Sequence, residues 1–178
     1  MQDDTPTSHT AAGPVDELRQ QQLMATAYHE AGHAVMAICL GRPIHKVTIR
    51  PGRSEMGAVR LGVCQLQKGR AKSSNDVLED EVLILYAGMV AEARFTGQYC
   101  RQGAAQDLMA IRRLLCTRAN TPAQFERLQR RMLDKAEHLM DDGVNVRAVD
   151  LLAQELVEKT TISGRAVRHF YHQAKCQN

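Results

Sequence analysis

The sequence contains no tryptophan, and aromatic residues make up only 4% of its 178 residues. Leucine, valine, alanine and methionine must therefore fill the interior of any folded domain. Apolar residues account for 44% of the chain, which excludes an intrinsically disordered protein. The length suits one domain with a substantial core.

Long hydrophobic runs are also missing. The most apolar stretch, "VLILYAGMVA" at 82–91, is too short to span a membrane, and acidic residues flank it. The first residues, "MQDDTPTSHTAAGPVDE", have the composition of neither a signal peptide nor a transit peptide. We therefore expect a soluble cytoplasmic protein with a flexible polar tail at 1–16 and one domain at 17–178.

Patterns typical of disulfide-bonded proteins and of nucleic-acid-binding proteins are also absent. The five cysteines are odd in number and widely spaced, without a CxxC pair, which indicates free thiols in a reducing compartment. The net charge is only +3, and no basic run is interleaved with aromatic residues. This charge pattern argues against a nucleic-acid partner.

Hydrophobic periodicity and capping residues predict a mainly α protein (α+β) with one small β-hairpin or sheet. Gly41 and Pro43 should end the first helix. Alternating apolar residues predict strands at 43–50 and 58–66. The predicted helices span 17–40, 77–95, 107–119, 122–141, 144–159 and 163–175, with "KTTISG" at 159–164 as a break between the last two.

The stretch "AYHEAGHAVMA" places two histidines, His29 and His33, four residues apart with Glu30 between them. On a helix the two imidazoles lie about 40° apart and can meet one metal ion, while Glu30 can reach a water on that ion. The surrounding residues are apolar, so these polar groups would be costly to bury unless they were paired or bound a metal. Gly32, in mid-helix, suggests that another backbone or a substrate comes close.

A catalytic zinc site needs a third protein ligand and one open position. A third histidine in an HxxGxxH pattern is absent after His33. Glu92 and Asp107 are the carboxylates next to apolar helical stretches, while Glu55, in a loop, is less constrained. Spacing does not choose between Glu92 and Asp107: either could bind the metal, and the other could hold an imidazole N–H.

Five segments in this order resemble the peptidase domain of the FtsH-type zinc proteases: "AYHEAGHAVMA", "GRPIHKVTIRPG", "LGV", "AGMVAEARFTG" and "GAAQDLMAIRRL". The resemblance runs from about Leu23 to the C-terminal helices. It implies the helical fold of that domain and a zinc peptidase in which His29, His33 and Asp107 bind Zn²⁺. It also implies that Glu30 is the catalytic base and that Glu92 holds a ligand histidine.

The sequence departs from that family in three places. Met89 and Ala93 replace polar residues of the family motif, the connection "TRANTPAQ" is short, and no GxxxxGK[ST] phosphate loop is present. We therefore expect a peptidase without its own ATPase that cleaves peptides or unfolded proteins. We also expect a homo-oligomer smaller than a hexamer, with a dimer favoured, or a separate partner ATPase.

The alternative is a catalytically weak or silent zinc-binding adaptor that recognises unfolded segments or a partner protein. Glu30 distinguishes the peptidase from the adaptor, because a purely structural zinc site does not need a general base. Hydrolysis of a non-protein amide is a third option. The strand at 58–66 is a candidate edge for an extended substrate. The sequence assigns no role to two features: Cys100, in the loop before Asp107, and the row of His169, His172 and Cys176 on one helix face.

Overall fold

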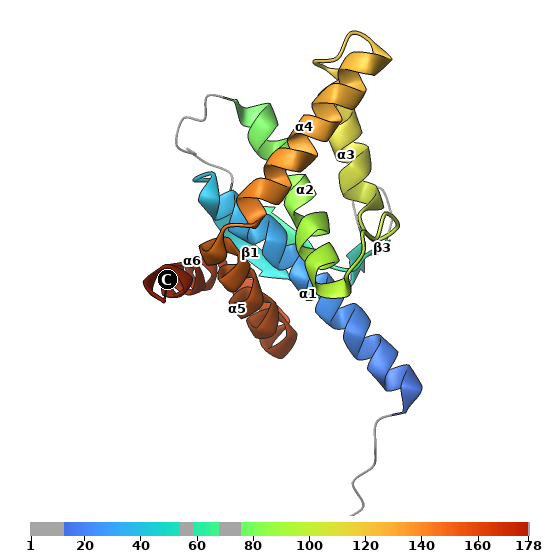
Figure 1. Ribbon diagram of the computed structural model, residues 1–178. Helices are drawn as coiled ribbons and strands as arrows, with labels where there is room; N and C mark the ends of the chain where they lie inside the picture. Colours follow the sequence, from blue (N-terminus) through green and yellow to red (C-terminus); the bar gives the residue numbers. More distant parts are fainter. Residues whose placement is uncertain (1–12, 54–58, 68–75, 178) are drawn as a thin grey trace, which may run out of the picture.

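The computed structural model describes residues 13–53, 59–67 and 76–177 (Figure 1). In these residues it contains six helices and five short strands, which confirms the mainly α prediction. Residues 1–12 of the predicted tail and Glu55 lie outside the described residues, so the division at 16/17 stays a prediction. The helices are α1 (Pro14–Cys39), α2 (Val77–Thr96), α3 (Ala105–Cys116), α4 (Pro122–Met140), α5 (Gly143–Lys159) and α6 (Gly164–Cys176).

Local signals explain where the helices begin and end. Pro14 occupies the first turn of α1, and the main chain reverses at Gly41, whose φ of 72° suits glycine. The Asp76 carboxylate caps α2 by accepting a hydrogen bond from the Glu79 amide, and the Thr121 hydroxyl caps α4 in the same way. These caps agree with the predicted helix starts, whereas α3 begins at Ala105, slightly before the predicted start at Asp107.

The strands form a three-stranded antiparallel sheet in the order β4–β1–β5, from β1 (Ile44–Thr48), β4 (Val63–Leu66) and β5 (Thr161–Ser163). Pairing of β1 with β4 confirms the predicted hairpin or small sheet. The predicted break at "KTTISG" between the last two helices is confirmed, but it also contains a strand that the sequence did not predict, because residues 161–163 pair with β1. A separate two-stranded ribbon joins β2 (Gly52–Arg53) and β3 (Val59–Arg60).

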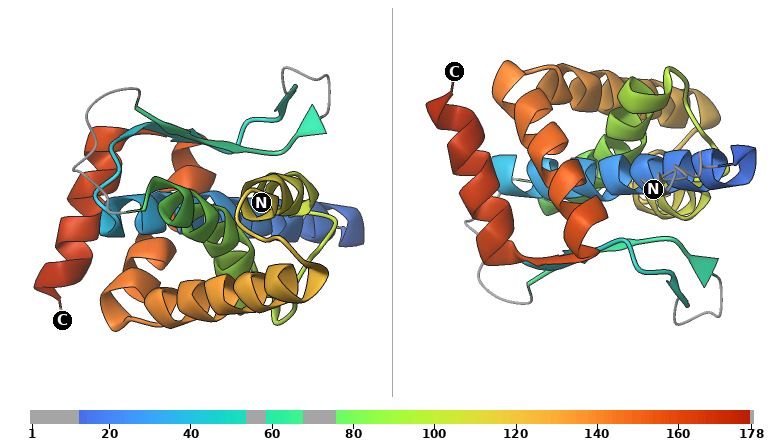
Figure 2. Two further views of the ribbon diagram at one scale, coloured as in Figure 1. Left: turned by 90° about the horizontal axis from the view of Figure 1, so that it is seen from above. Right: turned by 90° about the horizontal axis from the view of Figure 1, so that it is seen from below.

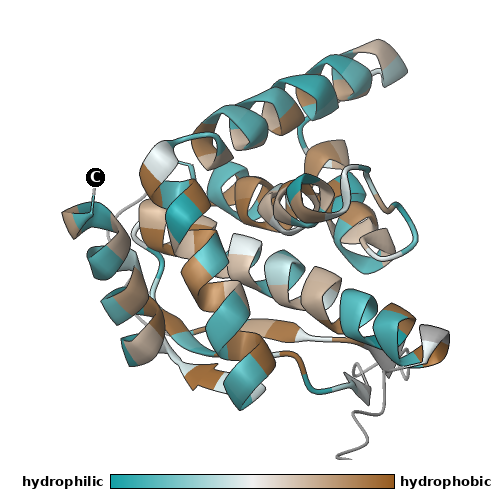
Figure 3. Ribbon diagram, turned by 60° about the horizontal axis from the view of Figure 1, so that its bottom comes forward, coloured by the Kyte–Doolittle hydropathy of each residue, from teal (hydrophilic) through white to brown (hydrophobic). Residues whose placement is uncertain are grey.

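Helix α1 is the central element of the fold. It packs against α2, α5 and the sheet, and in Figure 2 the sheet and α4 lie on opposite sides of it. Hydrophobic and hydrophilic bands alternate along the helices, as amphipathic packing requires (Figure 3). Among the helices that the structure describes, none combines the length and the hydropathy that crossing a bilayer requires.

The contact between α1 and α2 depends on Gly32. A β-carbon on Gly32 would lie 2.4 Å from the carbonyl oxygen of Ala87 and 2.7 Å from the β-carbon of Ala91. The backbone of α2 therefore occupies the space that a side chain at residue 32 would need. This close approach is the one that a glycine in mid-helix suggested.

We predict that Gly32→Ala destabilises the protein. Alanine favours the helix by about 1 kcal/mol, but the clash with the α2 backbone must push the helices apart. We expect a net loss of about 1–2 kcal/mol in the free energy of unfolding, measured by urea denaturation. Gly52→Ala is the control, because a β-carbon there meets nothing within 4 Å. Equal stability of the two variants would show that α1 and α2 do not pack this closely.

Candidate metal centre

The two histidines of α1 lie side by side in the interior. His29, Glu30 and His33 are all buried. The ring centroids of His29 and His33 are 4.7 Å apart, and the rings are nearly perpendicular, at 84°. Four residues on a helix bring both imidazoles to one face, as the sequence predicted.

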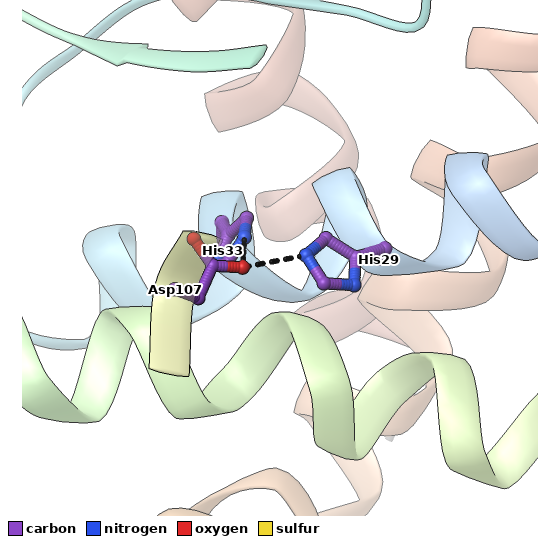
Figure 4. A group of neighbouring side chains, drawn as sticks. All are labelled: His29, His33 and Asp107. Atoms are coloured by element: carbon purple, nitrogen blue, oxygen red, sulfur yellow. Dashed lines mark hydrogen bonds and ion pairs between the residues drawn. The ribbon is translucent and has the colours of Figure 1, made fainter. Parts of the chain in front are cut away.

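Asp107 completes this group from another helix. It lies in the first turn of α3, and its Oδ2 atom is 2.9 Å from His29 Nε2 and 3.4 Å from His33 Nε2 (Figure 4). The ligand atoms of the three residues lie within 4.8 Å of one another. Within the described part of the chain, this is the one group of three or more such side chains that could hold a metal ion.

The Nδ1 atom of each histidine ring has a hydrogen-bond partner of its own. Glu92 Oε2 lies 2.8 Å from His29 Nδ1, and the Ile84 carbonyl oxygen lies 2.7 Å from His33 Nδ1. A carbonyl oxygen only accepts, so His33 Nδ1 carries the proton. In the neutral ring the Nε2 atom, which faces Asp107, is therefore the one that can bind a metal. This arrangement places Asp107 beside the two Nε2 atoms and Glu92 beside the Nδ1 atom of His29.

Gly88 is a site residue to which the sequence interpretation gave no role. A β-carbon on Gly88 would lie 2.4 Å from His33 Cε1, 2.6 Å from His33 Nε2 and 2.9 Å from His29 Nε2. The α2 backbone therefore lies directly against both rings. Gly88 belongs to the sequence motif "AGMVAEA". The sequence alone does not show that the rings of His29 and His33 on α1 occupy the space beside it.

Gly62 plays a similar part beside Glu30. It lies between β3 and β4, and a β-carbon there would be 2.5 Å from Glu30 Oε1. The chain entering β4 thus passes directly over the Glu30 carboxylate. Cys64, two residues further on, has a raised pKa because its thiol is buried and faces the negative charge of Glu30.

The carboxylates shift the protonation of both imidazoles. Burial lowers the pKa of His29, but hydrogen bonds to Asp107 and Glu92 outweigh burial and raise that pKa to about 10. The pKa of His33 is also raised, since the attraction of Asp107 exceeds the opposing effect of burial. Burial raises the pKa of Asp107, yet the neighbouring His33 and His29 lower it well below its usual range.

The remaining candidates lie apart from this group. Cys100 accepts a hydrogen bond from the Gly103 amide at 3.3 Å. A β-carbon on Gly103 would be 3.3 Å from both Cys100 Sγ and Glu92 Oε1, so the Cys100 loop packs behind Glu92 and not among the metal-facing atoms. His169, His172 and Cys176 are exposed on α6 and form no metal-binding group. All five cysteines are free.

Comparison with known proteins agrees with this geometry. The model of peptidase family M41 matches residues 16–120, which include His29, His33, Glu92 and Asp107. This match confirms the resemblance that the five sequence segments indicated. It covers α1, the β1–β4 region, α2 and α3, the elements that form the site.

Curated relatives named ATP-dependent zinc metalloprotease FtsH are also similar. The protein from Pseudomonas putida is 32% identical over 164 residues, which cover 84% of this chain and 26% of the relative. Those from Chlamydia trachomatis serovar L2 (31% over 105 residues) and Protochlamydia amoebophila (35% over 94 residues) match 56% and 52% of this chain. The matched regions make up 11% and 10% of those two relatives, so the chain spans only a minor part of each.

The raised imidazole pKa values predict that metal binding releases protons. A histidine binds a metal as neutral imidazole, but His29, with a pKa of about 10, is protonated at pH 8 in the metal-free protein. Binding of a divalent ion at pH 8 should therefore release about one proton or more. Calorimetry in two buffers with different ionisation enthalpies measures this number. His172→Ala, on exposed α6, should leave it unchanged, and metal binding without proton release at pH 8 would contradict the prediction.

Proposed function

The chain belongs to peptidase family M41, and from this premise we propose that it is a zinc metallopeptidase that hydrolyses peptide bonds in peptides and unfolded proteins. The observation that carries the proposal is the convergence of His29 Nε2, His33 Nε2 and Asp107 Oδ2, with Glu30 buried beside them. Two imidazoles and one carboxylate are the ligand types that Zn²⁺ accepts in a catalytic site, with a fourth position open.

In this proposal each side chain has a distinct role. His29, His33 and Asp107 hold the zinc, and Glu92 and the Ile84 carbonyl fix the two rings through their Nδ1 atoms. When bound, zinc would supply Lewis-acid chemistry, polarising the scissile carbonyl and lowering the pKa of a water to about 7. Glu30 accepts the proton of the attacking water and then donates it to the leaving amine nitrogen.

The sheet edge offers a place for the substrate backbone. Within the described residues β4 pairs with β1 alone, so its other edge is available, and the chain at Gly62 passes over Glu30. A peptide that adds to this edge as a strand would carry its backbone past the general base. Main-chain hydrogen bonds would supply affinity with little demand on sequence, which suits unfolded chains.

Several properties of the whole protein belong to the same proposal. We infer that this chain cleaves unfolded substrates without added ATP. A dimer, or a separate ATPase that delivers substrate, is our expectation for assembly. The proposed cytoplasmic location rests on the free cysteines, because free thiols are typical of a reducing compartment. The alternative, a silent zinc-binding adaptor, would retain the metal and the peptide but would not cleave.

The ligand assignment predicts unequal effects of removing the two carboxylates. Asp107→Ala removes an oxygen that faces both Nε2 atoms, so zinc should be lost from the purified protein. Glu92→Ala removes only the partner of His29 Nδ1 and should weaken zinc affinity by about 10–100-fold without abolishing binding. Metal analysis and chelator competition measure both effects. Zinc retained in Asp107→Ala but lost in Glu92→Ala would reverse the two roles.

The role of Glu30 predicts a separation of metal binding from catalysis. Glu30→Gln keeps the size of the side chain and removes the base, so zinc should stay bound while cleavage falls by about a hundredfold or more. The comparison uses zinc-loaded wild type and Glu30→Gln with an unfolded chain such as casein, without ATP. A chelator should abolish wild-type cleavage. Equal rates in the two proteins would reject Glu30 as the base, and zinc binding without any cleavage would favour the adaptor.

A further inference from the structure

A pocket separate from the metal centre lies where α1, α2 and α5 meet the C-terminal end of α4. Its volume is about 300 Å³, at the lower end of the roughly 300–1,000 Å³ that small-molecule sites occupy. The aliphatic part of its lining comes from Ala91, Met140, Val146 and Val149. None of the residues that line the pocket belongs to the metal-facing group. It is therefore a candidate binding site in its own right.

Two aromatic rings contribute to the wall of this pocket. The ring of Tyr28 on α1 stacks on the ring of Phe95 on α2, with centroids 4.6 Å apart and 13° between the ring planes. Phe95 is 41% exposed, so part of the stack is open to solvent. Aromatic rings bury the apolar body of a ligand, and their faces also attract organic cations.

Two charged side chains line the pocket, and only one of them has an ionic partner. The Arg94 guanidinium donates a hydrogen bond to the Met140 carbonyl oxygen at 3.0 Å and forms an ion pair with Asp141. Asp150 accepts a hydrogen bond from the Tyr28 hydroxyl at 3.0 Å, but a phenol is neutral at neutral pH. Among the described residues, no lysine, arginine or histidine forms an ion pair with Asp150. The Asp150 carboxylate therefore places an uncompensated negative charge at the pocket.

We propose that this pocket binds a small organic cation, an ammonium group carried on an aromatic or branched aliphatic body. The ammonium would lie at Asp150, where the Tyr28 hydroxyl occupies Oδ1 and no described residue bonds to Oδ2. The apolar body would lie against the Tyr28–Phe95 stack and the aliphatic lining. This site goes beyond the proposed function and does not depend on it, because its residues have no part in zinc binding or cleavage.

Charge and size decide between the classes of ligand. An anion would be repelled by Asp150, while Arg94 already has Met140 and Asp141 as partners. A neutral apolar molecule would take water from the Asp150 carboxylate without replacing it, which weakens binding. A volume of about 300 Å³ suits one small molecule, whereas a polypeptide would have to keep most of its chain outside the pocket. A free organic amine meets all three conditions.

Three ligands of nearly equal size test the charge of the occupant. Phenethylamine joins a primary ammonium to one aromatic ring, phenethyl alcohol is its neutral counterpart, and hydrocinnamate is its anionic counterpart. Calorimetric titration of the purified full chain gives the affinities, and amide chemical shifts in NMR spectra locate the ligand. We expect saturable binding of phenethylamine, about tenfold or more tighter than that of phenethyl alcohol, and no binding of hydrocinnamate. The shifts should occur at Ala91, Val146 and Val149.

Variants of α5 test the residues of the pocket. Asp150→Asn keeps an acceptor for the Tyr28 hydroxyl and removes the charge, so phenethylamine should bind about tenfold more weakly while phenethyl alcohol binds as before. Glu158→Gln is the matched control, because Glu158 is exposed on the same helix and does not line the pocket. Val146→Phe fills the pocket and should abolish binding of both ligands. Thermal melts followed by circular dichroism check that each variant is folded.

Two results would overturn the proposal. One is equal affinity of the wild-type chain for phenethylamine and phenethyl alcohol. The other is equal affinity of Asp150→Asn and Glu158→Gln for phenethylamine. A tripeptide amide, Phe-Gly-Gly, presents the same ammonium and ring at the end of a polypeptide. Tighter binding of this peptide than of phenethylamine would assign the pocket to a peptide N-terminus and would overturn the small-molecule assignment.

Asp107→Ala separates this site from the proposed function. Phenethylamine should bind this variant as tightly as it binds the wild-type chain, because the pocket shares no residue with the metal-facing group. Loss of binding in Asp107→Ala, with chemical shifts confined to the surroundings of His29, would place the amine at the metal centre and overturn the second site. Failure of the chain to bind zinc or to cleave casein would reject the peptidase and leave the amine site standing.

Discussion

The close approach of α1 and α2 is the constraint on which the rest of the site depends. Gly32 lets the α2 backbone lie against α1, and Gly88 lets the rings of His29 and His33 lie against α2. With side chains at these two positions the helices would separate, and the space between them would admit water. The glycines therefore allow two imidazoles to be held in a tightly packed interior, which is where fixed ligand geometry is easiest to maintain.

Such burial has an electrostatic consequence. Taking imidazoles and carboxylates out of water is costly unless each finds a partner. Glu92, Asp107 and the Ile84 carbonyl supply those partners, and in the metal-free protein they hold protons on the histidines. A divalent cation can take the place of these protons between the two Nε2 atoms and Asp107. The same carboxylates that raise the imidazole pKa values thus prepare the site for a metal.

Much of this structure could be predicted from the sequence, because its signals are local. The His29–His33 spacing, the caps at Asp76 and Thr121 and the alternation in β1 and β4 depend on neighbouring residues, and the structure shows each. Strand β5 was missed because three residues become a strand only through pairing with β1, far away in the chain. Spacing left Glu92 and Asp107 equivalent, since their positions relative to the imidazoles depend on how α2 and α3 pack against α1.

The central claim is that His29, His33 and Asp107 hold a zinc ion, and X-ray absorption at the zinc edge of the loaded protein tests it most directly. The account predicts two imidazole nitrogens and oxygen ligands, all at about 2.0–2.2 Å, with no sulfur. A shell of sulfur at about 2.3 Å would place the metal on cysteine instead. That result would contradict the site and the peptidase mechanism built on it.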